Sequence, residues 1–137
     1  MGCTSERTVE SGKIKNAGYP VCRLTIPLTT EVYALAPLNN DRLVLGAKNE
    51  LLLYEGGSKS IITISKEHKG RINVLIRLSN GNVASGGQDN AIKIWDIDKN
   101  QSISTLKGHT SIIWEIRELE GNKIISGADD NKSKIWV

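Results

Sequence analysis

The chain has 137 residues, of which 39% are hydrophobic and 24% are charged, as is typical of a globular domain. The formal net charge of +3 is too small to indicate a nucleic acid or an acidic substrate as the partner. The apolar residues are mostly Ile, Leu and Val, which favours β-strands, and the apolar runs are too short to span a bilayer.

Residues 1–20 are polar, carry mixed charge and show no period, so we expect a flexible N-terminal arm. The arm lacks the apolar core of a secretory signal. The two cysteines, Cys3 and Cys22, are too few for a disulfide framework. Together these features predict reduced cysteines and a cytoplasmic protein.

The start of the chain also allows acylation. Gly2 could carry a myristoyl group and Cys3 a palmitoyl group, and two chains together give stable membrane attachment. Glu6 stands where this motif prefers Ser or Thr. The alternative is an ordinary N-terminus followed by small residues, in which case the protein has no membrane contact.

From residue 21 onward, short apolar runs alternate with Gly, Asn and Asp turns, which predicts antiparallel meanders. We expect a first strand at 21–26, within an N-terminal strand segment of 21–30, followed by units at 31–67, 68–108 and 109–137. Strands are expected at 32–38, 43–45, 50–54 and 60–64, at 72–78, 83–85, 91–95 and 102–106, and at 112–119, 123–126 and 132–136.

Two of these units share four residues in phase. His68, Ser85, Asp89 and Trp95 recur 41 positions later as His109, Ser126, Asp130 and Trp136. A period near 40 indicates stacked modules, none of which can bury its own faces alone. The unit at 31–67 is degenerate: Tyr54 replaces the Trp, Pro27 occupies the His position, and the Ser and Asp are missing.

The repeated residues resemble the WD-repeat β-propeller family. The resemblance rests on Gly108-His109, on Ser126-Gly127-Ala128-Asp129-Asp130 with Ile135-Trp136, and on the run from Ser85 to Trp95-Asp96. It implies an all-β fold of about three four-stranded antiparallel blades. The sequence departs from the family at Glu67, which replaces a Gly, at Val137, which replaces an Asp, and at Ser133, where Ile92 predicts a buried aliphatic residue.

A propeller needs about four to eight blades, so three blades cannot close a ring. We therefore expect an incomplete propeller, an amino-terminal fragment or truncated product whose third blade lacks its outer strand. In the family an amino-terminal strand often completes the last blade, and 21–26 is placed to do so. Alternatively, two chains could exchange these strands and build a six-bladed ring.

The resemblance implies a structural role for the repeated residues. In each unit the Trp would donate its indole N–H to the Ser, and the His would link the Ser to the Asp. Ser, His and Asp also occur in nucleophilic catalysis, but a catalytic triad does not recur at one spacing with a Trp each time. We therefore expect a protein that is not an enzyme and has no cofactor.

Metal sites are not expected either. Two histidines without a second cluster of ligands do not make a zinc site. The run from Asp96 begins like a calcium loop, but Gln101 and Lys107 stand where Gly and Glu are required.

The candidate binding residues lie where the inner strands begin. The residue after the first apolar position of each inner strand, Tyr33, Asn73 or Trp114, should face the channel mouth. The resemblance adds flanking positions to this partner-binding face: Glu31, Arg71, Gln88, Ile112 and Asp129. Tyr, Trp and Arg are frequent hot-spot residues, although Trp114 could instead pack against a neighbouring blade.

These features predict a non-enzymatic interaction scaffold or adaptor that presents a propeller face to a protein or peptide. We do not expect a nucleic acid partner, and unpaired strand edges predict self-association. Two alternatives stay open: the N-terminal part of a regulatory propeller in a longer enzyme, and a lipid-anchored membrane adaptor.

Overall fold

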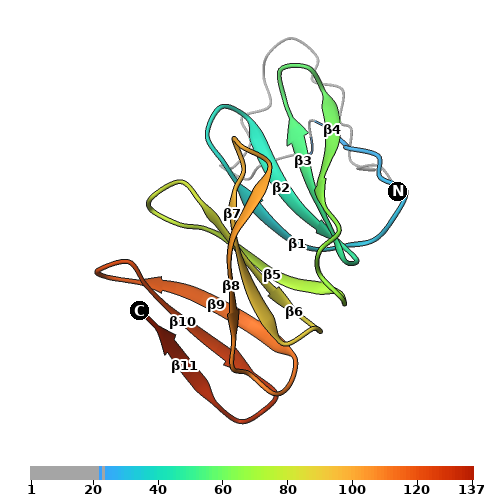
Figure 1. The fold of residues 1–137 in the computed structure, drawn as a ribbon. Helices are drawn as coiled ribbons and strands as arrows, with labels where there is room; N and C mark the ends of the chain where they lie inside the picture. The colour runs from blue at the N-terminus through green and yellow to red at the C-terminus, as the bar shows by residue number, and fades with distance from the viewer. Residues whose placement is uncertain (1–21, 23) are drawn as a thin grey trace, which may run out of the picture.

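The computed structural model describes residue 22 and residues 24–137, which form three antiparallel sheets stacked in chain order (Figure 1). The first contains β1 (Val32–Pro37), β2 (Arg42–Ala47), β3 (Glu50–Glu55) and β4 (Ser60–Ser65). The second contains β5 (Ile72–Arg77), β6 (Val83–Gly87), β7 (Ala91–Asp96) and β8 (Gln101–Lys107). The third contains β9 (Ile113–Leu119), β10 (Lys123–Ala128) and β11 (Ser133–Trp136).

Each sheet is a meander in which consecutive strands pair, and the described residues form no closed ring. The predicted all-β fold of a partial propeller is therefore confirmed. The inner strands lie side by side, β1 beside β5 and β5 beside β9. Their N-terminal ends meet at one edge of the stack, which we call the rim.

Asparagines make the tight turns next to the rim possible. Asn90 and Asn131 directly follow Asp89 and Asp130, and their φ angles are 63° and 61°. Asn tolerates this left-handed conformation better than most residues. Each turn therefore reverses the chain directly after an aspartate of the repeat.

Apolar side chains fill both spaces between the sheets, because each sheet is apolar on the faces that meet. Between the first and second sheets the core is Ala36, Val44, Leu51, Leu53, Ile72, Leu75, Val83, Trp95 and Ile97. Between the second and third it is Val74, Leu78, Ala84, Ile92, Ile113, Ile116 and Ile124. Trp95 and Trp136 thus each pack toward the preceding sheet.

Two glycines allow this close packing. A Cβ atom on Gly46 would lie 2.8 Å from Ile72 Cγ2, and one on Gly86 would lie 3.0 Å from Ile113 Cγ2. The equivalent residue of the third sheet, Gly127, has nothing within 4 Å of such an atom. The outer face of the third sheet is therefore uncovered in the described part of the chain.

That open face explains one departure from the family pattern. Ser133 is exposed, whereas the equivalent Ile92 is fully buried between two sheets. Ile135, which pairs with Ile125 across β10 and β11, is 58% exposed. The aliphatic requirement at Ile92 comes from the adjoining sheet, which Ser133 does not have.

The segment before β1 differs from the expected strand. Cys22 and residues 24–26, the described part of 21–26, form no strand. A strand needs a neighbour to bond its backbone groups, and no other strand pairs with this segment within the described residues. Instead, Ile26 and Leu28 pack on the outer face of the first sheet, against Leu45, Ala47, Leu52 and Tyr54. Cys22 is disulfide-bonded, so the expectation of reduced cysteines is wrong for this residue.

Candidate functional site

The four repeated residues of the second sheet form a continuous hydrogen-bonded chain, which we call the relay. Trp95 Nε1 donates to Ser85 Oγ at 2.7 Å. Ser85 Oγ lies 2.6 Å from His68 Nε2, and His68 Nδ1 lies 2.7 Å from Asp89 Oδ2. The indole N–H can only donate, so Ser85 Oγ accepts from Trp95, and the His68 ring joins this hydroxyl to the Asp89 carboxylate.

The third sheet repeats this geometry with its own four residues. Trp136 Nε1 donates to Ser126 Oγ at 2.9 Å, and Ser126 Oγ lies 2.7 Å from His109 Nε2. His109 Nδ1 lies 2.7 Å from Asp130 Oδ2. The structure therefore brings together all eight residues that the sequence placed in the two relays.

Each aspartate also fastens two backbone segments. Asp89 Oδ2 accepts from Lys69 N at 3.0 Å, and Asp89 Oδ1 accepts from Ala91 N at 3.4 Å. In the third sheet, Asp130 Oδ2 accepts from Thr110 N and Oδ1 accepts from Lys132 N, both at 3.0 Å. The relay thus ties the loop that enters each inner strand to the turn that leads into the third strand.

These bonds decide how the aspartates titrate. Burial by itself raises the pKa of Asp89, but hydrogen bonds from His68, Lys69 N and Ala91 N favour the ionised form and lower the pKa overall. The same balance of burial against hydrogen bonds lowers the pKa of Asp130 to about 2. Both carboxylates therefore stay ionised well below neutral pH.

The relay geometry suits a structural role better than nucleophilic catalysis. Ser85 and Ser126 are 0% and 2% exposed, and each Oγ is bonded to both a Trp and a His. A nucleophilic serine must reach a substrate carbonyl. The hydroxyls of Ser85 and Ser126 are too deeply buried to reach a substrate carbonyl.

The first sheet, which lacks a relay, is joined to the second at the same end by its β2–β3 turn. Lys48 O accepts from Ile72 N at 2.7 Å, and Asn49 Nδ2 donates to His68 O at 3.3 Å. The sequence reasoning missed Asn49. The signal was present in the stretch from Leu45 to Asn49, which is one residue shorter than its counterpart.

Three predicted face residues from three different sheets stack together at the rim. The Cζ atom of Arg71 lies 4.4 Å from the centre of the Tyr33 ring and 5.9 Å from the centre of the Trp114 ring. Tyr33 is 44% exposed and Trp114 is 48% exposed. The guanidinium therefore joins two exposed aromatic rings into one surface.

Two amide side chains hold this stack in place. Arg71 Nε donates to Asn73 Oδ1 at 2.8 Å, and Asn73 Nδ2 donates to Ile113 O at 3.2 Å, which links β5 to β9. Gln88 Oε1 accepts from Arg71 N at 3.2 Å, and Gln88 N donates to Arg71 O at 2.9 Å. We call Tyr33, Arg71, Asn73, Gln88 and Trp114 the rim cluster.

The remaining predicted positions lie outside this cluster. Glu31 Oε2 lies 3.7 Å from Lys48 Nζ at the first sheet. Ile112 O accepts from Asp129 N at 2.9 Å at the third sheet. In the described part of the chain no hydrogen bond or ion pair joins these residues to the rim cluster, so Asp129 does not pair with Arg71. Gly2 and Cys3 lie outside the described residues.

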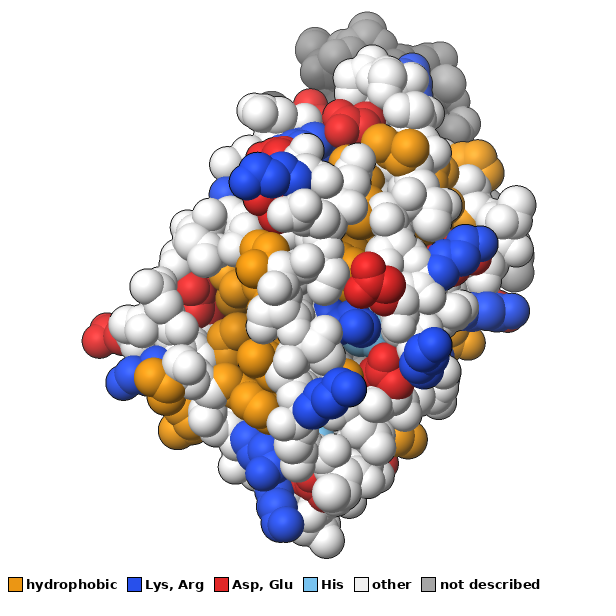
Figure 2. Space-filling model, viewed as in Figure 1, with side chains coloured by type: hydrophobic (Ala, Val, Ile, Leu, Met, Phe, Trp, Pro, Cys, Tyr) orange, Lys and Arg blue, Asp and Glu red, His pale blue; other side chains and the backbone are white. Residues whose placement is uncertain are grey.

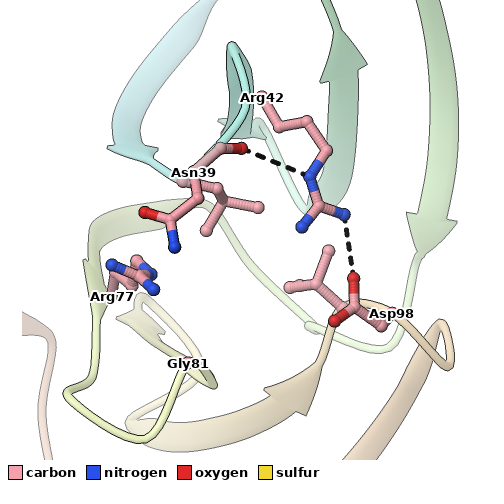
Figure 3. Close-up of a pocket in the computed structure, with 7 residues that line it drawn as sticks. Asn39, Arg42, Arg77, Gly81 and Asp98 are labelled. Atoms are coloured by element: carbon pink, nitrogen blue, oxygen red, sulfur yellow. Dashed lines mark hydrogen bonds and ion pairs between the residues drawn. The ribbon is translucent and has the colours of Figure 1, made fainter.

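A small pocket lies at the opposite end of the sheets (Figure 3). It holds about 110 Å³ and is lined by Leu38, Asn39, Arg42, Arg77, Gly81, Ile97 and Asp98. Arg42 Nη1 binds Asp98 Oδ1 at 2.8 Å and so joins the first two sheets (Figure 3). The pocket is well below the ~300 Å³ of an ordinary ligand site.

Outside the rim, the side chains of the described residues form no better candidate for a functional site than the rim cluster. On the face shown in Figure 2, basic and acidic side chains are interspersed, with hydrophobic side chains between them. The described residues contain no cluster of His, Cys, Asp and Glu that could hold a metal ion. They also contain no helix long and apolar enough to cross a membrane.

Comparison with protein families matches residues 58–96 and 100–137 to the WD40 model, described as WD domain, G-beta repeat. The first match covers β4 to β7 and the second covers β8 to β11. Each sequence repeat therefore begins with the outer strand of the preceding sheet.

Solved structures show the same fold. The chain is similar to the WD40 β-propeller domain of Doa1, with a TM-score of 0.71 and 20% identity over 77% of this chain and 36% of that one. It is also similar to a chain of the Mitotic Checkpoint Complex, with a TM-score of 0.66 and 12% identity over 76% of this chain and 33% of that one. The chain spans about a third of the length of these structures. A search of curated proteins gave no match.

Proposed function

Because the chain belongs to the WD-repeat β-propeller family, we propose that it is a non-enzymatic scaffold that binds a protein or peptide through its rim cluster. WD40 propeller domains generally mediate interactions between proteins, and one of the solved structures it resembles is a protein complex.

The observation that carries the proposal is the stack of Tyr33, Arg71 and Trp114 across three sheets. Two large rings that are nearly half exposed keep apolar area in water, which a partner would cover. Tyr, Trp and Arg are also the residue types that most often dominate binding energy at interfaces. The relays support this surface because they fix the loops on which Arg71 and Gln88 stand.

The decisive variant is Trp114→Ala. We expect it to weaken partner capture by about 2 kcal/mol or more, as for a binding hot spot. It should lower the melting temperature less than it weakens capture, because Trp114 is 48% exposed and its cation–π contact with Arg71 contributes only about 0.5–1 kcal/mol.

Ile103→Ala is the matched control, since Ile103 on β8 is 50% exposed and lies outside the rim cluster. The measurement is a quantitative pull-down beside a melting curve for each variant. Equal loss of capture by both variants, or a loss that only follows the loss of stability, would make Trp114 an ordinary surface or packing residue and remove the proposal.

A further inference from the structure

We propose that the rim cluster recognises an anionic group of its partner, a carboxylate or a phosphate on a peptide, through the guanidinium of Arg71. This inference rests on the proposed function and names the chemistry that the surface selects.

Arg71 has unused donors. Its Nε is bonded to Asn73 Oδ1, whereas its Nη atoms bond to none of the described residues. Arg71 also forms no ion pair there, whereas three of the lysines near this end of the sheets do. Lys48 pairs with Glu31, Lys66 with Glu50 and Lys93 with Glu67.

The surroundings of Arg71 leave one direction for a ligand. Tyr33 and Trp114 lie within cation–π distance of the guanidinium, and Asn73 occupies its Nε. A ligand can therefore bind along the edge that carries the two Nη groups. This edge matches the paired oxygens of a carboxylate or phosphate, to which arginine binds with two parallel hydrogen bonds.

The neighbours of Arg71 offer donors but few acceptors. The side-chain oxygens of Asn73 and Gln88 already accept from Arg71. Gln88 Nε2 and Trp114 Nε1 donate to none of the described residues, and both side chains are exposed. The carboxylates of Glu31 and Asp89 are engaged with Lys48 and His68. A ligand rich in acceptors and negative charge fits this composition, whereas a cationic ligand does not.

The experiment uses the immobilised full chain and pools of short, random, C-terminally amidated peptides. The pools differ only in one fixed central residue, which is Glu, phosphoserine, Gln or Lys. The retained fraction is measured for the wild type and for Arg71→Gln, Arg71→Lys and Arg77→Gln. Arg77 is the matched control because it is exposed at the opposite end of β5, so its loss changes the net charge equally.

We expect the Glu or the phosphoserine pool to be retained about tenfold more than the Gln pool, and the Lys pool least. Arg71→Gln should reduce the retention of the Glu and phosphoserine pools to that of the Gln pool. Arg71→Lys should keep only part of their retention, because lysine lacks the planar fork of arginine. Arg77→Gln should behave as the wild type. Whichever of the Glu and phosphoserine pools is retained more identifies the anion that the surface binds.

The anion proposal is overturned if the Gln or Lys pool is retained as well as the Glu and phosphoserine pools. It is also overturned if Arg71→Gln and Arg77→Gln reduce retention equally. A Trp114→Ala arm separates this failure from failure of the proposed function. If Trp114→Ala still lowers retention of peptides that show no charge preference, only the anion proposal is lost. If Trp114→Ala lowers the retention of no pool, both proposals are lost.

Discussion

At the scale of single residues, the relay side chains depend on one another because each has a partner that only the others supply. Trp95 and Ser85 are fully buried and bonded to each other, so loss of one leaves a buried polar atom of the other without its bond. A buried network adds rigidity only when all its members are satisfied. This accounts for the first unit, which lacks the Trp, Ser, His and Asp together.

Acid titration of the Asp130 relay tests its structural role. The pKa of Asp130 is about 2 in the folded chain against an ordinary value of 3.8, so the unfolded chain takes up the proton at higher pH. The stabilisation is therefore complete above pH 3.8 and is lost as the pH falls toward about 2. We expect Asp130→Asn to be less stable than the wild type at neutral pH and to lose less stability in this window.

Urea unfolding at a series of pH values measures both effects. Asp89 keeps part of the acid sensitivity in the variant, because its pKa is also lowered in the folded chain. Parallel stability curves for wild type and variant between neutral and acid pH would contradict the role assigned to the Asp130–His109 bond.

At the scale of strands and sheets, sequence reasoning succeeded where the signal is local. The relay residues and the turns between strands follow from fixed residue types at fixed spacing, and all eight relay residues meet as expected. Cys22 and residues 24–26, the described part of the expected strand 21–26, form no strand, since an apolar run becomes a strand only if another strand pairs with it.

The rim shows a second limit of sequence reasoning. The family pattern placed Tyr33, Arg71 and Trp114 near one another, but their stacking joins side chains from three sheets about 40 residues apart in the chain. No spacing rule specifies such a contact. Asn49 is a different case, because the shortened stretch from Leu45 to Asn49 marks its turn in the sequence, although not its partner, His68 O.

The close approach of successive sheets predicts different costs for three glycine substitutions. Gly46→Ala should destabilise the chain by about 1–3 kcal/mol, because the new methyl group would lie 2.8 Å from Ile72 Cγ2. Gly86→Ala should also destabilise it, and by less, because its nearest contacts would be at 3.0 Å. Gly127→Ala meets nothing within 4 Å and should leave stability unchanged or raise it slightly.

Thermal or urea unfolding of the three variants gives the order of stability. Gly127 serves as the internal control, since it occupies the same position in its sheet as Gly46 and Gly86. A cost at Gly127 equal to that at Gly46 would show that something packs on the outer face of the third sheet in solution.

At the scale of the whole molecule, the two ends of the stack differ. The outer face of the first sheet is apolar and is covered by Ile26 and Leu28. The outer face of the third sheet carries Arg117, Ser133 and Ile135, paired through β9, β10 and β11. Arg117 Nη2 lies 3.4 Å from Glu115 Oε2, and both side chains are mostly exposed. Burying this ion pair against another apolar sheet would cost desolvation energy, so the third face is poorly suited to face-to-face packing.

The edge of β11 imposes no such cost on association. In the described part of the chain β11 is the outermost strand of its sheet and pairs only with β10, so its other edge presents free backbone N–H and C=O groups. We therefore predict concentration-dependent self-association of the isolated chain through this edge. Sedimentation velocity at several concentrations should show larger species as the concentration rises. The amide hydrogens of Ser133–Trp136 should exchange more slowly at the higher concentrations. Ile135→Lys, which places a charge on the open face, should leave association nearly intact if the edge is responsible and abolish it if the face is. A monomer that stays the same at every concentration would show that the edge of β11 is not available for pairing.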